Sequence, residues 1–199
     1  MIESMIDDNI TSYRYQSKEN PVFGFYTQKS TKDWWFDLFR GSFVGYNLDD
    51  EIVTLAFEDI YHNFQYTLLP HASELLCDIK REKTKVCAFT NTDERIHGVL
   101  SNLGIDQHFD FVQTSAESGL EKPRLQGFLK ILKIADIEEA EKCIHFGDKY
   151  KNDFAPAINI GMDAILMGEH EDVPRHKSVN SLKDFHNYLF RQGLTNSNK

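Results

Sequence analysis

The chain has 199 residues, a net charge of -9 and a pI near 5.3, and 41% of its residues are hydrophobic. This length predicts one domain, or one core with a small accessory unit, and the apolar fraction is enough to fill a core. The acidic balance argues against nucleic acid or an anionic membrane as the main partner. The sequence has no run of 18 apolar residues and no signal character at its start, so we expect an intracellular protein without a transmembrane helix, in the cytoplasm or alternatively the nucleus.

The first part of the chain, residues 1–68, predicts helices and contains no strand pattern. An apolar pattern over residues 2–15 predicts a first helix. Ser30 or Thr31 is suited to cap a second helix, and Asn47 to cap a third.

The third helix carries an apolar stripe formed by Ile52, Leu55, Ala56, Ile60, Tyr61 and Phe64. We interpret this stripe and the aromatic side chains of the second helix as a helix-on-helix core. A role for Trp34 or Trp35 in a pocket is the less favoured alternative.

After Pro70, short β-rich runs alternate with helical patterns. Strands are predicted at residues 85–90, 109–113, 144–146 and 163–167. Helices are predicted at residues 72–81, 93–103, 124–133, 153–160 and 182–191. This alternation predicts an α/β fold with a Rossmann-like parallel sheet that has helices on both faces. We therefore divide the chain into a helical part, residues 1–68, and an α/β core, residues 69–199.

Local signals support the ends of these helices. Gly104 and Gly161 are predicted to close the helices that precede them, and Gly161 is placed where a left-handed conformation is needed. Pro123 is predicted in the first turn of helix 124–133. Ser181 is predicted to cap the last helix.

Cysteine and histidine placement points away from a zinc site or a disulfide. Cys77, Cys87 and Cys143 are widely spaced and have apolar neighbours, which predicts reduced thiols in the core. The eight histidines never fall into a ligand spacing, so we expect structural or surface roles for them.

Two acids flank the turn after the third predicted strand. Asp148 follows the strand directly, and Asp153 begins the next helical pattern. Two carboxylates in this arrangement suit Mg²⁺, which takes oxygen ligands and keeps several waters. The alternative is a loop acid beside a helix-capping acid.

Polar residues of complementary kinds follow three predicted strands. Thr90 and Asn91 follow the first strand, Lys122 lies in the loop after the second, and Asp148 follows the third. Ligands of open parallel sheets bind beyond the carboxyl ends of the strands, so we expect one shared site there. Lysine, hydroxyl and amide groups hold a phosphoryl group, and Mg²⁺ neutralises it from another side. No attacking group is apparent at this rim.

The motifs that carry these residues resemble motifs two, three and four of the haloacid dehalogenase superfamily. They read Ala-Phe-Thr-Asn-Thr-Asp at 88–93, Gly-Leu-Glu-Lys-Pro at 119–123 and His-Phe-Gly-Asp-Lys-Tyr-Lys-Asn-Asp at 145–153. The match continues through Gly-Met-Asp-Ala-Ile-Leu at 161–166. Upstream, Asn-Pro-Val-Phe-Gly-Phe at 20–25 and Thr-Lys-Asp-Trp-Trp-Phe at 31–36 are similar to the helical cap of family members.

This resemblance implies a core of the same fold, an N-terminal helical cap and a hydrolase of phosphatase type. It implies that Thr90 and Lys122 bind phosphate and that Asn91 helps to orient it. It also implies that Asp148 and Asp153 hold Mg²⁺. The partner implied is a small phosphorylated molecule.

The chain departs from the family pattern in two places. The third motif of the family continues Lys-Pro-Asp-Pro, whereas here Arg124 and Leu125 follow Pro123. The first motif of the family is an aspartate nucleophile at the end of an N-terminal apolar strand, and no such strand precedes the helical part. Asp7 and Asp8 mimic its spacing, but we interpret them as part of a helix.

The missing strand is the middle of the sheet in the family, so we predict a gap, or an altered neighbour, between strands 85–90 and 143–147. We expect a hydrolase-family chain that binds phosphate and Mg²⁺ and is inactive because the segment with the nucleophile is absent. The alternatives are an active Mg²⁺-dependent phosphomonoesterase and a non-catalytic binding or regulatory protein. The sequence predicts neither the substrate nor a protein partner.

Overall fold

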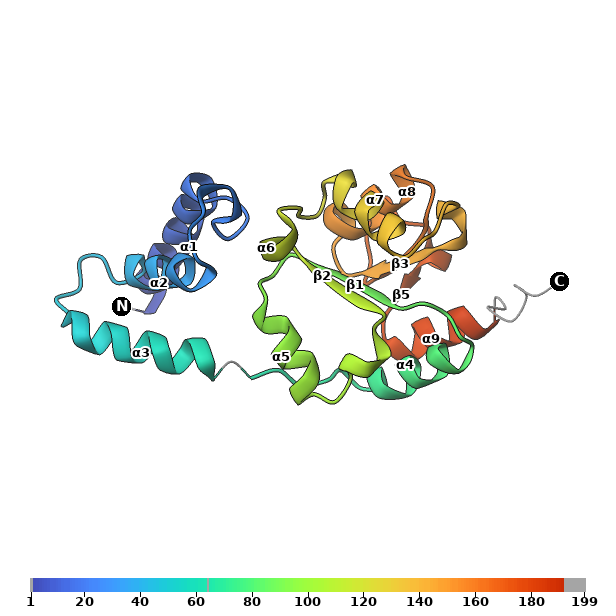
Figure 1. Ribbon diagram of the computed structural model, residues 1–199, viewed down its shortest axis with the longest axis horizontal. Helices are drawn as coiled ribbons and strands as arrows, with labels where there is room; N and C mark the ends of the chain where they lie inside the picture. Colours follow the sequence, from blue (N-terminus) through green and yellow to red (C-terminus); the bar gives the residue numbers. More distant parts are fainter. Residues whose placement is uncertain (1, 64, 192–199) are drawn as a thin grey trace.

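The computed structural model describes residues 2–63 and 65–191 of the chain (Figure 1). Its first part contains three helices, α1 (Ile2–Glu19), α2 (Thr31–Gly41) and α3 (Asp50–His62). These helices and the segments that join them lie to one side of the remaining elements in Figure 1, and we call residues 2–63 the helical unit. The predicted boundary at residues 68 and 69 falls between α3 and the first helix of the core and stays a prediction.

The cap of α2 is confirmed and the cap of α3 is not. Ser30 accepts a hydrogen bond from the Asp33 backbone N–H at 3.0 Å. The predicted cap at Asn47 is wrong, because α3 begins at Asp50 and the Asp49 carboxylate accepts from the Glu51 N–H at 2.8 Å. A side chain can cap only when it directly precedes the first helical residue, and Asn47 stands too far upstream.

The helical unit packs through aromatic side chains, although the predicted stripe on α3 is misplaced. The buried side chains of α3 are Val53 and Phe57. The Phe57 ring lies against the rings of Phe36 and Phe39 on α2, at centroid distances of 5.1 and 5.8 Å. The face predicted to be buried is largely exposed, at Ile52, Leu55 and Ile60. Phe64 lies outside the described residues.

Over the described residues, the core contains five strands in two separate parallel sheets. The first sheet pairs β1 (Cys87–Thr90) with β2 (Phe111–Thr114). The second has the order β3 (Ile144–Gly147), β4 (Asp163–Met167) and β5 (Ser178–Val179). No pairing joins β1 to β3 within the described part of the chain. The predicted gap between these two strands is therefore confirmed.

Helices cover both faces of the strands. Their bounds are α4 (Ala72–Arg81), α5 (Arg95–Asn102), α6 (Ser115–Ser118), α7 (Leu125–Ile134), α8 (Ala155–Asn159) and α9 (Leu182–Arg191). Figure 1 shows α7 and α8 on one side of the strands and α4 and α9 on the other. This arrangement confirms the predicted open α/β fold.

Two apolar clusters hold these layers together, one on each face of β4. Ala164 and Leu166 of β4 pack with Phe128 of α7 and Ala157 of α8. Ile165 points to the opposite face and belongs to a cluster with side chains of α4, α9 and β5. Side chains alternate between faces along a strand, so the buried middle of β4, residues 164–166, must be apolar on both faces.

Some element boundaries differ from the prediction. Pro123 precedes the N-cap residue Arg124 and so lies outside the first turn of α7. The predicted helix 153–160 divides into a π-helical turn, Tyr150–Phe154, and α8. Both α6 and β5 were not predicted, because each is too short to show a period. The left-handed Gly161, at φ 86°, is confirmed.

None of the described helices is both long enough and apolar enough to cross a bilayer.

Candidate functional site

The site is built on the loop that contains Lys122, which Asn91 holds at the end of β1. The Asn91 side chain donates to the Lys122 carbonyl at 2.8 Å and accepts from the Lys122 N–H at 2.7 Å. These two hydrogen bonds fix a loop that lies 31 positions away in the sequence. Two of the predicted rim residues are thus in direct contact.

The Lys122 ammonium points to Asp153, the second predicted acid. Its Nζ donates to Asp153 Oδ1 at 2.6 Å, and His145 Nε2 lies 3.0 Å from the same oxygen. The Lys149 backbone N–H donates to the other oxygen, Oδ2, at 3.0 Å. Asp153 is only 3% exposed. Burial alone would raise the pKa of Asp153, but the contacts with His145 and Lys122 lower it to about 2.

Gly147 makes room for this buried carboxylate. A Cβ atom on Gly147 would lie 2.3 Å from Asp153 Cγ and 2.7 Å from Asp153 Oδ1. Any larger residue at the end of β3 would therefore displace the acid. The glycine that ends β3 is needed for space.

The other predicted site residues are less tightly held. The Asp148 side chain is 65% exposed and lies 3.3 Å from the Lys149 ammonium. Thr90 ends β1 and is half-buried, paired in register with Thr114 of β2. The structure thus brings Asn91, Lys122 and Asp153 into one network, with Thr90 and Asp148 beside it in the chain. Their roles stay predictions.

The structure also shows a buried ion pair that sequence reasoning missed. Asp93 is 1% exposed and accepts hydrogen bonds from Arg95 Nη2 at 2.7 Å and Arg95 Nε at 2.8 Å. The Trp35 indole N–H donates to Asp93 Oδ2 at 2.8 Å. Burial alone would raise the pKa of Asp93, but these donors hold it below its ordinary value. The Arg95 guanidinium also lies 4.2 Å from the Tyr61 ring centroid. This pair therefore connects the helical unit to the core.

A second contact joins the helical unit to the loop of the third motif. The Tyr26 hydroxyl donates to the Gly119 carbonyl at 2.5 Å. A Cβ atom on Gly119 would lie 2.4 Å from a ring carbon of Phe25, and Gly119 has φ +70°. Only glycine meets both demands, the positive φ and the close approach.

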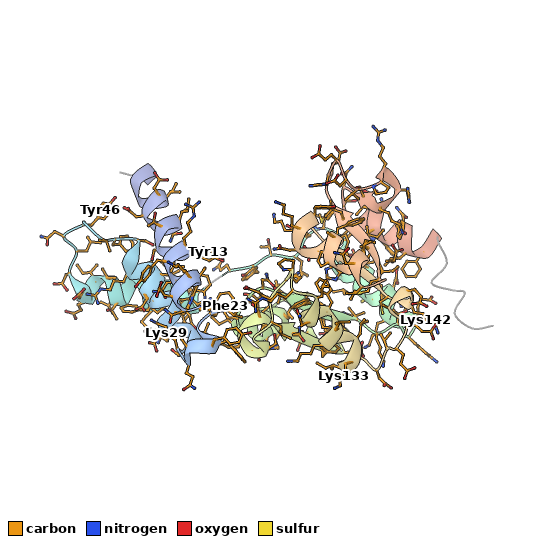
Figure 2. The ribbon with its side chains drawn as sticks, turned by 90° about the horizontal axis from the view of Figure 1, so that it is seen from above. Tyr13, Phe23, Lys29, Tyr46, Lys133 and Lys142 are labelled. Atoms are coloured by element: carbon orange, nitrogen blue, oxygen red, sulfur yellow. The ribbon has the colours of Figure 1, made fainter. Side chains whose placement is uncertain are left out.

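A cavity of about 350 Å³ lies between the helical unit and the end of β1. Its walls are mainly aromatic and aliphatic, and its polar side chains come from both parts of the chain. The residues that line the cavity include Tyr13, Phe23, Trp35, Phe57, Asn91, Asp93 and Arg95. Figure 2 labels Tyr13 and Phe23 on the helical unit. Trp35 thus lines a cavity, whereas Trp34 is 2% exposed and belongs to the packed interior.

The functional candidates that sequence reasoning missed are His145, Arg95 and Tyr26, and Trp35 is the residue of the less favoured alternative that does line a cavity. His145 was expected to have a structural or surface role, yet it contacts the acid at the centre of the network. Its position two residues before the Gly-Asp of the fourth motif was the available signal. Arg95 carried a weaker signal, since it lies two residues after an acid at a strand end.

Among the described residues, no three His, Cys, Asp or Glu side chains gather in a way that could hold a metal ion. Asp153 already accepts from Lys122, His145 and Lys149. Asp148 is thus the one acid of the predicted pair whose carboxylate is open to solvent.

Both the sequence and the fold are similar to those of known proteins. The model of the haloacid dehalogenase-like hydrolase family matches residues 8–161. Haloacid dehalogenase-like hydrolase domain-containing protein 3 of Bos taurus is 30% identical over 165 residues, which cover 80% of this chain and 65% of that protein. Glyceraldehyde 3-phosphate phosphatase of Methanocaldococcus jannaschii is 33% identical over 146 residues, 68% of this chain and 63% of that protein.

Among solved structures, the 2-haloacid dehalogenase from Pseudomonas syringae pv. Tomato DC3000 superposes with a TM-score of 0.67 at 20% identity. It covers 94% of this chain, and the chain covers 81% of it. At this identity the likeness shows the fold alone. The chain spans about two thirds or slightly less of the length of the curated relatives it matches.

Proposed function

Because the chain belongs to the haloacid dehalogenase-like hydrolase family, we propose that its core is a phosphatase-type scaffold that binds the phosphate of a small molecule. The observation that carries this proposal is the position of Lys122: Asn91, which lines the cavity, holds the Lys122 backbone at the end of β1, and the Lys122 ammonium reaches Asp153 at the same rim. The relative that acts on glyceraldehyde 3-phosphate supports a small phosphorylated substrate.

The chain's own residues supply suitable donors for a phosphoryl group. Lys122 offers an ammonium and Thr90 a hydroxyl, and charge-assisted hydrogen bonds of this kind are strong. Asn91 keeps the Lys122 loop in place and so positions its charge. The Lys122 ammonium donates to Asp153 in this structure. To bind phosphate, the ammonium must turn toward the ligand or donate to both groups at once.

The Mg²⁺ that the family resemblance implies does not fit the described side chains as they stand. Mg²⁺ needs near-octahedral oxygen ligands, of which proteins supply one or two carboxylates. Both oxygens of Asp153 already accept hydrogen bonds from cationic or backbone groups, which leaves Asp148 alone. One carboxylate that is 65% exposed is a weak site for Mg²⁺ in the absence of a phosphate ligand, and no step of the reaction is assigned to the ion.

The attacking group of the family has no counterpart among the described rim residues. Asp7 and Asp8, which mimic the spacing of the first motif, lie in the middle of α1. We propose that the chain alone does not hydrolyse phosphate esters. Loss of an essential nucleophile lowers kcat by about 10⁴–10⁶.

Turnover of p-nitrophenyl phosphate, measured with and without Mg²⁺, tests the inactivity. No release above a buffer blank is expected. Mg²⁺-dependent release that Asp7→Asn abolishes would instead establish the active phosphomonoesterase alternative.

Binding of inorganic phosphate, followed by calorimetry, tests the scaffold itself. Replacing Lys122 by methionine removes a charged donor, which predicts a loss of about 10–100-fold in affinity. Lys122→Arg keeps the charge and the contact with Asp153 and should keep most of the affinity. Lys130→Met, at an exposed site on α7, is the matched control. Equal binding by all four chains would refute the assigned role of Lys122.

Thermal unfolding with and without MgCl₂ tests whether Mg²⁺ binds these side chains. A concentration of about 5–10 mM is roughly tenfold above a weak Kd. We expect little or no shift of Tm, and the same result for Asp148→Asn. The control is Asp50→Asn, an exposed acid paired with Arg40 in the helical unit. A large shift that Asp148→Asn removes and Asp50→Asn keeps would show that Asp148 holds Mg²⁺ tightly after all.

A further inference from the structure

Two histidines that lie far apart in the sequence are joined by a short hydrogen bond. His71 directly precedes α4, and His186 lies in the middle of α9. His71 Nε2 is 2.7 Å from His186 Nδ1, and the two ring centroids are 5.0 Å apart. We call these two residues the histidine pair. The pair connects segments that are 115 positions apart in the sequence.

The histidine pair lies where the chain passes from the helical unit into the core. Figure 1 shows α4 and α9 on the same side of the strands, and their inner faces share an apolar cluster that includes Leu75, Ile79, Phe185 and Leu189. His71 is the last residue of the connection between α3 and α4. The pair therefore fixes the end of this connection to α9.

The conformation of His71 leaves its side chain available for this contact. His71 is the N-cap residue of α4, yet its side chain makes no capping hydrogen bond and its φ is 73°. Positive φ is uncommon for residues other than glycine, although histidine adopts it more often than most. The His71 carbonyl accepts from the Leu75 N–H at 3.2 Å. A change in the contacts of His71 therefore acts directly on the first turn of α4.

One carboxylate faces the histidine pair. Asp78 Oδ2, on α4, lies 3.3 Å from His186 Nε2, the ring nitrogen that points away from His71. Arg81 Nη1 donates to the other oxygen of Asp78, Oδ1, at 2.7 Å. The charge of Asp78 is thus shared between His186 and an arginine.

The other titratable groups near the histidine pair have no contact with it. Glu74 on α4 and Lys183 on α9 each stand three residues from one histidine, but both are exposed and form no ion pair among the described residues. His108 also lies beside α4, where its Nε2 is 3.9 Å from Cys77 Sγ. The protonation of the pair therefore depends mainly on the two rings themselves and on Asp78.

The hydrogen bond between the two rings limits how many protons the pair can hold. One of the two facing nitrogens must carry a hydrogen, and the other must accept it. One additional proton can bind at the outer nitrogen of the donor ring without loss of the contact. With two additional protons, both facing nitrogens carry a hydrogen, which is incompatible with their separation of 2.7 Å. The contact must then break.

We propose that the histidine pair is an acid-sensitive contact, which holds the start of α4 on α9 near neutral pH and releases it below about pH 6. A free imidazole takes up its proton near pH 6.5. At pH 5.5 two free rings gain a factor of about 120 in statistical weight, whereas a closed pair with room for one proton gains about 20. The open form is thus favoured about sixfold over its weight at pH 7.5. The inference does not depend on phosphate binding.

Amide exchange at Leu75 measures the release, because its N–H is bonded to the His71 carbonyl. After correction for the intrinsic exchange rate, the opening constant at Leu75 should rise about sixfold from pH 7.5 to pH 5.5. In His71→Gln, an amide that takes up no proton replaces the ring, and the rise should disappear. His176→Gln, at an exposed site before β5, is the matched control and should keep the rise. The same rise in His71→Gln, or no rise in the unaltered chain, would overturn the proposal.

A change on the other side of the contact gives a second test, which decides the matter if His71→Gln does not fold. His186→Asn leaves the backbone of His71 untouched and places an amide near the position of Nδ1. Between pH 7.5 and 5.5, the unfolding constant in urea should rise about sixfold more in the unaltered chain than in His186→Asn. His176→Gln should behave like the unaltered chain. The same pH dependence in the unaltered chain and in His186→Asn would refute the assignment.

Discussion

Removal of the Arg95 side chain should be among the most destabilising single changes in the molecule. Asp93 is 1% exposed, and Arg95 supplies three of its hydrogen bonds, from the backbone N–H, Nε and Nη2. Arg95→Met keeps most of the apolar stem but leaves the Asp93 carboxylate buried with only the Trp35 indole and one backbone N–H. Breaking a buried ion pair from one side costs about 3–5 kcal/mol.

The matched control is Arg81→Met. Arg81 also pairs with an aspartate, Asp78, at 2.7 Å, but its side chain is 77% exposed. Such exposed pairs contribute about 0–1 kcal/mol. The two variants therefore remove the same side chain from pairs of similar length and different burial.

Urea and thermal unfolding of the two variants measure the difference. For a chain of this size, 1 kcal/mol corresponds to roughly 2–4 °C, so Arg95→Met should lower Tm by about 6–20 °C and Arg81→Met by at most about 4 °C. Tryptophan fluorescence should change in the Arg95 variant, because Trp35 donates to Asp93.

A double change separates the lost pair from lost packing. If the cost comes from an uncompensated charge, adding Asp93→Leu to Arg95→Met should recover part of the stability, because apolar replacements of a buried pair are often neutral. If the two single variants at Arg95 and Arg81 differ by less than about 1 kcal/mol, the reasoning fails.

Further predictions concern the network around Asp153 and the contact with the helical unit. Because its folded pKa, about 2, lies below the ordinary value of 3.8, ionised Asp153 stabilises the fold by about 2 kcal/mol above pH 4. This contribution is lost as the pH falls from about 4 to 2, so urea unfolding of Asp153→Asn should vary less with pH there. A parallel pH dependence in both chains argues against it. Gly147→Ala should lower Tm by several degrees, because the added methyl group meets Asp153. Gly98→Ala, in α5, has open space around the added methyl group and should raise Tm slightly. Equal shifts of Tm would contradict the crowding at Gly147. Tyr26→Phe should cost about 1 kcal/mol and speed amide exchange in the helical unit; unchanged exchange would show that this contact does not hold the unit.

Elements of the core with strong local signals were predicted closely. The helix Ala72–Arg81 and the strand Asp163–Met167 have the bounds that the sequence indicated. A periodic apolar pattern with a clear start and end contains this information within the segment itself. The cap at Ser181, which accepts from the Asp184 N–H at 3.1 Å, is of the same local kind.

The parts that were missed depend on partners far away in the chain. Trp35 contacts Asp93 across 58 positions, and Tyr26 contacts Gly119 across 93. No local pattern states which tryptophan will face the core, so Trp34 and Trp35 were indistinguishable. The buried face of α3 was predicted at the wrong residues for the same reason, because Phe57 is buried only through its packing against α2.

The gap in the sheet and the state of Lys122 are physically connected. No described pairing joins β1 to β3, so side-chain contacts tie the two sheets together, among them the packing of Phe89 on Phe128 of α7 and the ion pair of Lys122 with Asp153. A phosphate that draws Lys122 away would weaken this tie, so part of its binding free energy would be spent on loosening the core.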